Sequence, residues 1–331
     1  MKLAEATPFE EVLSAGGDEI RRLMEDVERQ LERISLGYGD QLARSATSTL
    51  AAGGKRLRPL LVFICGGGDG TVAEQRALVR AAVSVELVHM ATLVHDDVID
   101  GAPIRRGRPT IYAASGREVA TATGDFLFSR AFSLLGTNRD PGQIRTLSDA
   151  CLALARGELA QRRDAYATDV DADRYLRRCE LKTASLFVAS CRLGALAAGR
   201  APSQVEALGR FGRQVGLAFQ LLDDVLDVIG APDQTGKQRG TDLLEGTTTL
   251  PLILAGESDP SLAAPGLHSI DSRERAEELC DRIAATDALE SVRRRAFDLV
   301  RDARSEVDGN LPPPSSELLG LVADRIVERS K

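Results

Sequence analysis

The sequence has no tryptophan, few aromatic residues of any kind (4%), and only short apolar stretches. None approaches the ~20 residues that a membrane-spanning helix needs, so we expect no transmembrane segment. The first ten residues carry charge and lack an apolar core, so we expect no secretory signal. A chain of 331 residues with 43% hydrophobic residues and a formal charge of −7 is not disordered. Its acidity argues against a general nucleic-acid binder.

Cysteine and lysine are also scarce. The five cysteines are odd in number and form no CxxC pair: Cys65, Cys151, Cys179, Cys191 and Cys280. This pattern predicts reduced thiols that act as small hydrophobic residues in a cytoplasmic protein. The basic residues divide into 37 arginines and 5 lysines, and two of the lysines lie at the chain ends. The three internal lysines, Lys55, Lys182 and Lys237, therefore stand out in a chain that otherwise uses arginine.

Apolar residues recur at spacings of three and four along most of the chain, which predicts helix after helix. The predicted helices span residues 17–35, 40–52, 74–99, 117–135, 141–164, 171–198, 203–229, 273–284, 287–308 and 316–329. The glycine- and proline-rich breaks between them are too short for domain linkers, and no series of alternating strands is present. We predict an all-α protein, with residues 1–331 forming a single large helical bundle.

Two predicted helices are apolar on all sides, over residues 81–94 and 215–229, which is typical of the centre of a bundle. The first ends in a DDxxD cluster, Asp96, Asp97 and Asp100, and the second carries another, Asp223, Asp224 and Asp227. Within each cluster the first and last aspartates share one helical face, so they repel unless a cation neutralises them. Oxygen-only ligands favour Mg²⁺. A solvated helix end would explain one such pair but poorly explains two.

The position of the acidic residues supports this interpretation. Without the six clustered aspartates the chain would have 43 acidic residues against 42 basic ones. The net charge therefore resides largely in two groups that are expected to bind metal.

A carboxylate-bound Mg²⁺ implies a phosphorylated substrate, which in turn needs basic partners. Candidates follow the first cluster, at Arg105, Arg106 and Arg108, and occur in a glycine-led turn at Lys55 and Arg58. Lys182 and Lys237 complete the set of internal lysines. Each alone is ordinarily a surface cation, but lysine suits phosphate as a compact charge with three donors.

Taken together, these motifs resemble the trans-isoprenyl diphosphate synthases, the polyprenyl synthetase family, over a motif-bearing core of about residues 45–255. The matching segments are GGKRLRP at 53–59, HDDVID at 95–100, RRGRPT at 105–110, GDFLF at 124–128, KTA at 182–184, FQLLDDVLD at 219–227 and GTDLLEG at 240–246. The resemblance implies a helical bundle of the isoprenoid synthase type with a central substrate cavity. It implies an enzyme that adds isopentenyl diphosphate to an allylic prenyl diphosphate.

The resemblance also implies a role for each matching position. The six aspartates would hold about three Mg²⁺ ions between two facing helices. Arg105, Lys182 and Lys237 would bind the allylic diphosphate, and Lys55, Arg58, His89 and Arg106 would bind isopentenyl diphosphate. Thr183 and Gln220 would direct oxygen dipoles at the allylic cation. Without the resemblance, His89 would be interpreted as a core histidine.

Three positions complicate this assignment. His95, beside Asp96, resembles the His-Asp pair of a metal phosphohydrolase class, but His268 is a poor candidate for the further ligand that such a site needs. Thr247 stands where the family commonly has lysine, which removes one expected diphosphate contact. Gln238 likewise replaces a common proline beside Lys237.

The residues ahead of Asp96 are expected to set the length of the product, because the growing chain extends past them. Short-chain members carry bulky aromatics four or five places ahead of the first aspartate, where this chain has Thr92 and Ala91, followed a turn earlier by Val88, Leu87 and Ser84. These smaller residues predict an all-trans product of roughly C30–C50. The alternative is closure by Phe126 or Phe132 at C20, or a C15 product.

Two other functions were considered. A class I terpene cyclase shares the fold and the first cluster, but it would carry a different metal motif in place of Asp223–Asp227 and would need no isopentenyl site. A non-catalytic subunit of a heteromeric synthase would have lost one of the clusters, and both are complete here. The resemblance further implies a homodimer.

Overall fold

The computed structural model describes residues 9–36, 56–67, 70–105, 107–167, 169–230, 239–262 and 266–328. The predicted helix over residues 40–52 lies outside these ranges, as do Lys55, Arg106, Lys237 and Gln238. The chain divides into two compact units. Unit 1 comprises Met1–Cys151, Leu186–Gly209 and Val307–Val322, and unit 2 comprises Leu152–Ser185, Arg210–Glu306 and Ala323–Lys331.

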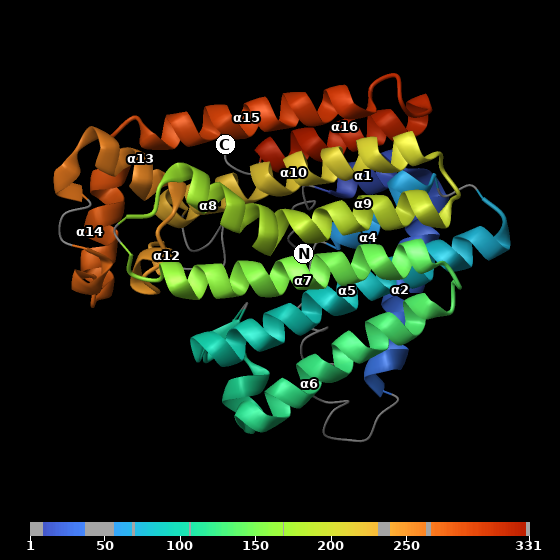
Figure 1. Ribbon diagram of the computed structural model, residues 1–331, viewed down its shortest axis with the longest axis horizontal. Helices are drawn as coiled ribbons and strands as arrows, with labels where there is room; N and C mark the ends of the chain where they lie inside the picture. The colour runs from blue at the N-terminus through green and yellow to red at the C-terminus, as the bar shows by residue number, and fades with distance from the viewer. Residues whose placement is uncertain are drawn as a thin grey trace, which may run out of the picture. The chain divides into compact units, whose positions relative to one another are not determined.

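Helices account for most of the described chain, as predicted (Figure 1). In chain order they are α1 (Glu10–Ala15), α2 (Gly17–Leu36), α4 (Leu57–Gly66), α5 (Val72–Asp100), α6 (Ile111–Gly136), α7 (Pro141–Asp164), α8 (Ala172–Cys179), α9 (Ser185–Ala197), α10 (Pro202–Ile229), α12 (Thr241–Leu244), α13 (Leu250–Ser258), α14 (Arg273–Ala284), α15 (Ala288–Val307) and α16 (Pro313–Glu328). A π-helical turn, Glu180–Ala184, joins α8 to α9, and 3₁₀ turns span Pro260–Leu262 and Leu267–Ser269.

The longest helix of unit 1, α5, has clear start and stop signals. Thr71 and Glu74 form a capping box at its first turn, and Gly101 ends it in the left-handed conformation with φ 63°. Fifteen of its side chains are buried, including most positions from Leu78 to Met90. Helix α6 runs alongside it (Figure 1). The expected all-round apolar helix is therefore a core helix of this unit.

By length and composition alone, α5 would also suffice to cross a membrane, since its most apolar window has a mean hydropathy of 1.6. However, 72% of that window is buried inside the protein. This burial is what a core helix of a folded domain shows.

A short hairpin follows α5, which the sequence pattern did not predict. Strands β1 (Ile104–Arg105) and β2 (Arg108–Pro109) pair antiparallel, with Ile104 opposite Pro109 and Arg105 opposite Arg108. Gly107 adopts a φ of 74° in the turn, a conformation that glycine tolerates best. The RRGRPT motif therefore folds back on itself directly after the first aspartate cluster.

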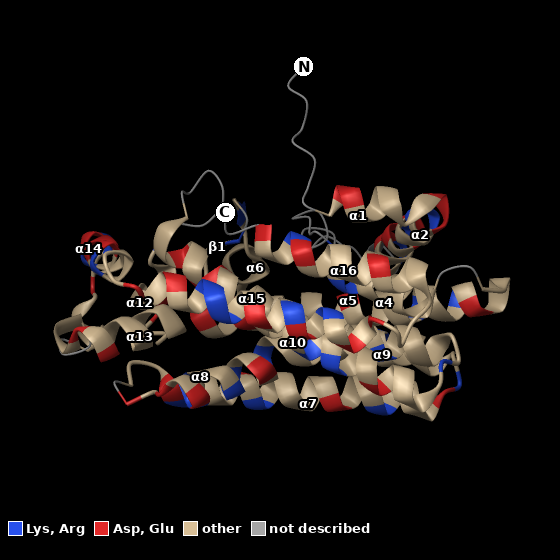
Figure 2. Cartoon of the chain, turned by 90° about the horizontal axis from the view of Figure 1, so that it is seen from above, with Lys and Arg blue, Asp and Glu red and all other residues tan. Residues whose placement is uncertain are grey.

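Helix α10 begins in unit 1, where Leu208 is buried, and continues into unit 2. Its unit 2 part contributes a similar core, with Phe211, Val215, Leu221 and Val225 all fully buried. Charged residues of both signs are interspersed along the helices, as on α8 (Figure 2). All five cysteines are free thiols, four of them buried, as predicted for small hydrophobic residues.

Candidate active site

The first aspartate cluster occupies the last turn of α5 in unit 1. Its middle residue, Asp97, is buried and accepts a hydrogen bond from Arg105 Nε at 2.7 Å, whereas Asp96 is half-buried and Asp100 exposed. Burial raises the pKa of Asp97, and the Arg105 guanidinium opposes that rise. Arg105 therefore neutralises the inner carboxylate.

The second cluster, on α10 in unit 2, has the same organisation. Asp224 is only 2% exposed, while Asp223 and Asp227 are half-buried. The Tyr175 hydroxyl from α8 donates a short hydrogen bond to Asp224, and Gln220 Nε2 donates another at 2.8 Å. Burial raises the pKa of both Asp224 and Tyr175. Tyr175 was not identified from the sequence, because a lone tyrosine in an amphipathic helix carries no motif.

This hydrogen-bonded chain extends to Thr183. The Thr183 hydroxyl donates to Gln220 Oε1 at 2.6 Å, so the Gln220 amide is engaged at both ends. Because Thr183 uses its single hydroxyl proton on Gln220, its remaining lone pairs can act only as acceptors. The two residues expected to direct oxygen dipoles are thus linked to each other and to Asp224.

Lys182 lies on the π-helical turn beside Thr183. Its ammonium group is 2.5 Å from Glu158 Oε2 on α7, and both side chains are largely buried. Neither the π turn nor Glu158 was predicted from the sequence.

The predicted isopentenyl-binding residues are only partly within the described ranges. Arg58 on α4 lies 4.9 Å from the ring centroid of Phe187, in cation–π geometry, and His89 on α5 is half-buried. Arg56, from the same GGKRLRP motif, has a structural role instead. It adopts a left-handed φ of 46° and pairs at 2.6 Å with both Glu28 and the buried Glu86.

The GDFLF motif on α6 surrounds His95. A Cβ atom at Gly124 would lie 2.2 Å from His95 Nε2, so only glycine allows the ring to approach this closely. Asp125 lies 3.4 Å from the same nitrogen, and the Phe128 ring is 5.7 Å from the imidazole centroid. The motif therefore holds the residue directly before Asp96 in place.

The chain-length positions lie on α5 as expected from their spacing. Ser84, Leu87, Val88 and Ala91 are fully buried, whereas Thr92 is half-buried and donates its hydroxyl to the His89 carbonyl. Phe126 and Phe132 on α6 are both half-buried.

Two positions around the GTDLLEG motif also have defined surroundings. The Thr247 amide donates to the Asp242 carbonyl at 2.8 Å. Gly246 has a φ of 69° and abuts the Tyr166 ring, which stacks on His268 with centroids 4.3 Å apart. Stacking accounts for His268 without a metal-binding role.

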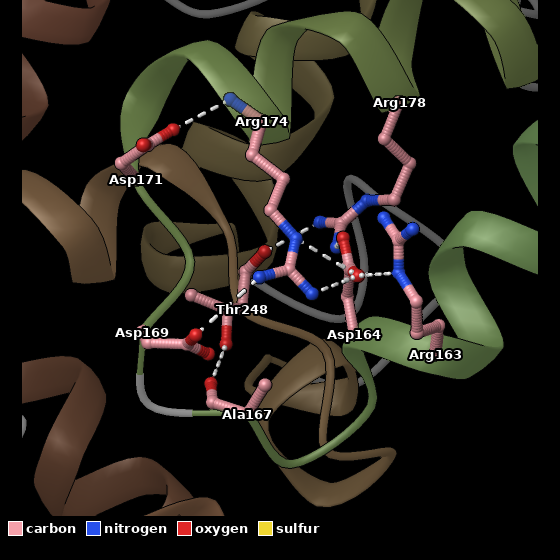
Figure 3. A network of polar contacts seen from close by, with 8 residues as sticks. All are labelled: Arg163, Asp164, Ala167, Asp169, Asp171, Arg174, Arg178 and Thr248. Carbon is pink, nitrogen blue, oxygen red and sulfur yellow. Dashed lines mark hydrogen bonds and ion pairs between the residues drawn. The ribbon is translucent and has the colours of Figure 1, made fainter.

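A buried carboxylate at the end of α7 orders the adjoining α8 (Figure 3). Asp164 is 1% exposed and accepts hydrogen bonds from Arg174 Nη2 at 2.6 Å and Arg163 Nε at 3.2 Å. Arg178, also buried, approaches its second oxygen at 3.7 Å and donates to the Thr248 carbonyl at 2.5 Å. These contacts tie α7, α8 and the segment before α13 together.

The donor set fits the divalent cation that the sequence implies. In each cluster the first and last carboxylates are spaced four residues apart and are less buried than the middle one, which accepts side-chain hydrogen bonds. In the parts of the chain described here, no three His, Cys, Asp or Glu side chains converge into a metal cage. Mg²⁺ commonly takes one or two carboxylates and completes its shell with water and phosphate oxygens.

Comparison with known proteins agrees with these motifs. The Polyprenyl synthetase family model matches residues 40–286. The chain is 40% identical to heptaprenyl diphosphate synthase component 2 of Geobacillus stearothermophilus, over 90% of this chain and 92% of that protein. It is 32% identical to a geranylgeranyl diphosphate synthase of Methanosarcina mazei, over 94% and 97% of the two chains.

A solved structure, heptaprenyl diphosphate synthase from Staphylococcus aureus, superposes with a TM-score of 0.87 at 30% identity, covering 94% of this chain and 99% of that one. The fold is thus the all-α isoprenoid synthase fold, as predicted. The chain belongs to the polyprenyl synthetase family and is a trans-prenyltransferase.

Proposed function

We propose that this protein is a Mg²⁺-dependent polyprenyl diphosphate synthase that extends an allylic prenyl diphosphate with isopentenyl diphosphate to an all-trans product of C30–C50. The observation that carries the proposed length is the small size of Ala91, Val88 and Ser84 on α5, where no Phe, Tyr or Trp precedes Asp96. The names of two similar proteins, both heptaprenyl diphosphate synthases, favour C35 within this range.

The proposed chemistry divides among the residues as follows. The six aspartates of the two clusters would hold about three Mg²⁺ ions, which would neutralise the leaving diphosphate. Arg105 and Lys182 would bind that diphosphate, together with Lys237. Arg58 and His89 would bind isopentenyl diphosphate, together with Lys55 and Arg106.

Two features of the hydrogen-bonded chain support the next step. Thr183, oriented by Gln220, would present oxygen lone pairs to the allylic cation. Asp97 and Asp224 would in addition orient Arg105 and Gln220 through the hydrogen bonds that they accept. The isopentenyl double bond then attacks the cation, a carbon–carbon bond forms, and a proton is lost.

A C20 product is the second candidate. The similarity to a geranylgeranyl diphosphate synthase favours it, as does the position of Phe126 and Phe132 on the helix packed against α5.

The number of subunits is also a proposal. The sequence resemblance implies a homodimer, but the name "component 2" belongs to a protein that has a second component. We propose that this chain carries the catalytic residues in either assembly, because both aspartate clusters are complete. Light scattering of the chain isolated from its own cells distinguishes a mass of twice 35.5 kDa from a complex with a different subunit.

The function is tested by incubating that preparation with labelled isopentenyl diphosphate and farnesyl diphosphate, with Mg²⁺ and with EDTA. We expect metal-dependent elongation to products of C30–C50 on thin-layer analysis. A product that stops at C20 supports the second candidate, and the absence of elongation contradicts both.

A further inference from the structure

Lys182 projects from an irregular part of the backbone. It lies within the π-helical turn Glu180–Ala184, where the Ser185 amide bonds to the carbonyl of Glu180, five residues earlier. Such turns are rare and concentrate at functional sites. A lysine side chain has four rotatable bonds, so a partner that restricts its conformation lowers the entropy lost when it binds a diphosphate.

Glu158 on α7 is that partner. Its Oε2 lies 2.5 Å from Lys182 Nζ, and the glutamate side chain is 16% exposed against 26% for the lysine. Its other oxygen, Oε1, accepts a hydrogen bond from Arg162 Nε at 2.9 Å, one turn further along α7. The carboxylate is therefore held from both sides, and its position is fixed by α7.

The backbone of α7 is shaped to bring the two groups together. A Cβ atom at Gly157 would lie 2.7 Å from the Lys182 amide nitrogen and 2.9 Å from its Cα. Both are main-chain atoms, so any larger residue at this position would push the π turn away from α7. Gly157 thus allows the backbone of Lys182 to pack closely on α7, and Glu158 forms an ion pair with the Lys182 side chain.

The charges are consistent with a stable pairing. Burial tends to raise the pKa of Glu158, but Lys182 and Arg162 together lower it below its ordinary value. The carboxylate is ionised and uses one of the three ammonium donors of Lys182, which leaves two for a ligand. The trio of Glu158, Lys182 and Arg162 keeps a net charge of +1, which still attracts a diphosphate.

We propose that Glu158 is a positioning residue that holds Lys182 in the orientation in which it binds the allylic diphosphate. This inference rests on the proposed function of Lys182. It assigns Glu158 no contact with substrate. Two other roles predict different results: a carboxylate that only weakens diphosphate binding by repulsion, and one that only stabilises the fold.

The kinetic test compares Glu158→Gln, which removes the charge, with Glu158→Asp, which keeps the charge but withdraws it by one methylene. We expect both to lower kcat/KM for the allylic substrate by about tenfold and to leave KM for isopentenyl diphosphate unchanged. In a Lys182→Ala background, Glu158→Gln should have no further effect, because the glutamate acts through the lysine. Tighter allylic binding by Glu158→Gln would support repulsion and overturn the proposal.

A matched control lies on the same π turn. Glu180 pairs with Arg213 at 2.5 Å, and both are exposed. Glu180→Gln removes an ion pair of the same type and should change none of these constants. If it lowers kcat/KM as much as Glu158→Gln, the effect belongs to the turn as a whole and the proposal is wrong.

A second readout does not depend on catalysis. The chain has only five lysines, so the side-chain ammonium signals can be followed by ¹⁵N NMR and that of Lys182 assigned with Lys182→Arg. We expect Glu158→Gln to shift and broaden the Lys182 signal and Glu180→Gln to leave it unchanged. An unchanged signal in Glu158→Gln overturns the proposal. Absence of prenyl transfer by the wild-type protein would instead refute the proposed function.

Discussion

Replacing Asp164 with asparagine tests the polar network at the end of α7. The change keeps the shape of the side chain but removes a negative charge that three arginines surround. Arg163 and Arg174 retain access to solvent, whereas the Arg178 side chain is 5% exposed and keeps the Thr248 carbonyl and the face of the Tyr175 ring. The main cost is therefore one buried cation without its counter-ion.

Removing one partner of a buried ion pair typically costs about 3–5 kcal/mol. We expect the lower end, about 3 kcal/mol, because Thr248 and the neutral amide oxygen of asparagine still accept hydrogen bonds. For a protein of this size that corresponds to a decrease in Tm of about 4 °C. Asp169→Asn is the matched control, because Asp169 also pairs with Arg174, at 3.6 Å, but is exposed to solvent. This substitution should lower the free energy of unfolding by at most about 1 kcal/mol.

The difference between wild type and Asp164→Asn should depend on pH. The arginines hold the pKa of Asp164 below its ordinary value of 3.8 despite its burial. A lowered folded-state pKa gives stability that is fully present above the unfolded value and lost as pH falls through the folded one. Differential scanning calorimetry should therefore show a constant gap in Tm above about pH 5 that narrows below pH 4. A gap that is absent at neutral pH, or that widens in acid, would refute this account of the network.

Three further experiments test the site. Asp223→Asn should lower kcat at least 100-fold with little change in Tm. Asp224→Asn should also destabilise the protein by about 1–3 kcal/mol, because Tyr175 and Gln220 lose their charged acceptor. An equal loss of stability in the two variants would contradict their different roles. Ala91→Phe should shorten the product by two or more isoprene units on thin-layer analysis. An unchanged product length would show that this position on α5 does not limit the growing chain. Gly124→Ala should destabilise the protein by about 1–3 kcal/mol through its clash with His95, and adding His95→Ala should recover most of that loss in a denaturation experiment; no recovery would place the cost elsewhere.

The sequence predicted the regular parts of this fold well. Apolar spacing located α7 and α14 at the residues where they begin and end, and α5 and α10 within two residues. Periodicity works here because each helix buries one stripe or its whole surface, and both patterns are visible in the chain. The short apolar helices α4 and α13 were not predicted, since runs of nine or ten residues fit a strand as well as a helix.

The site was predicted by residue type but not by arrangement. The spacing of the aspartates identified both clusters, but it did not predict that Asp97 and Asp224 are buried. Their burial is compensated by hydrogen bonds from Arg105 and Tyr175, which lie in other segments. Glu158 and Gly157 likewise gain significance only from the π turn that packs on them. Contacts between distant segments decide these features, and no local pattern encodes them.

Two complete aspartate clusters, together with the small residues ahead of Asp96 on α5, are what we propose to make this chain a long-chain prenyl diphosphate synthase. The most direct measurement is the length of the product made from farnesyl and labelled isopentenyl diphosphates by the chain isolated from its own cells, with and without Mg²⁺. We expect an all-trans product of C30–C50 that forms only with the metal. A product of C20 or shorter, or elongation that survives EDTA, would contradict it.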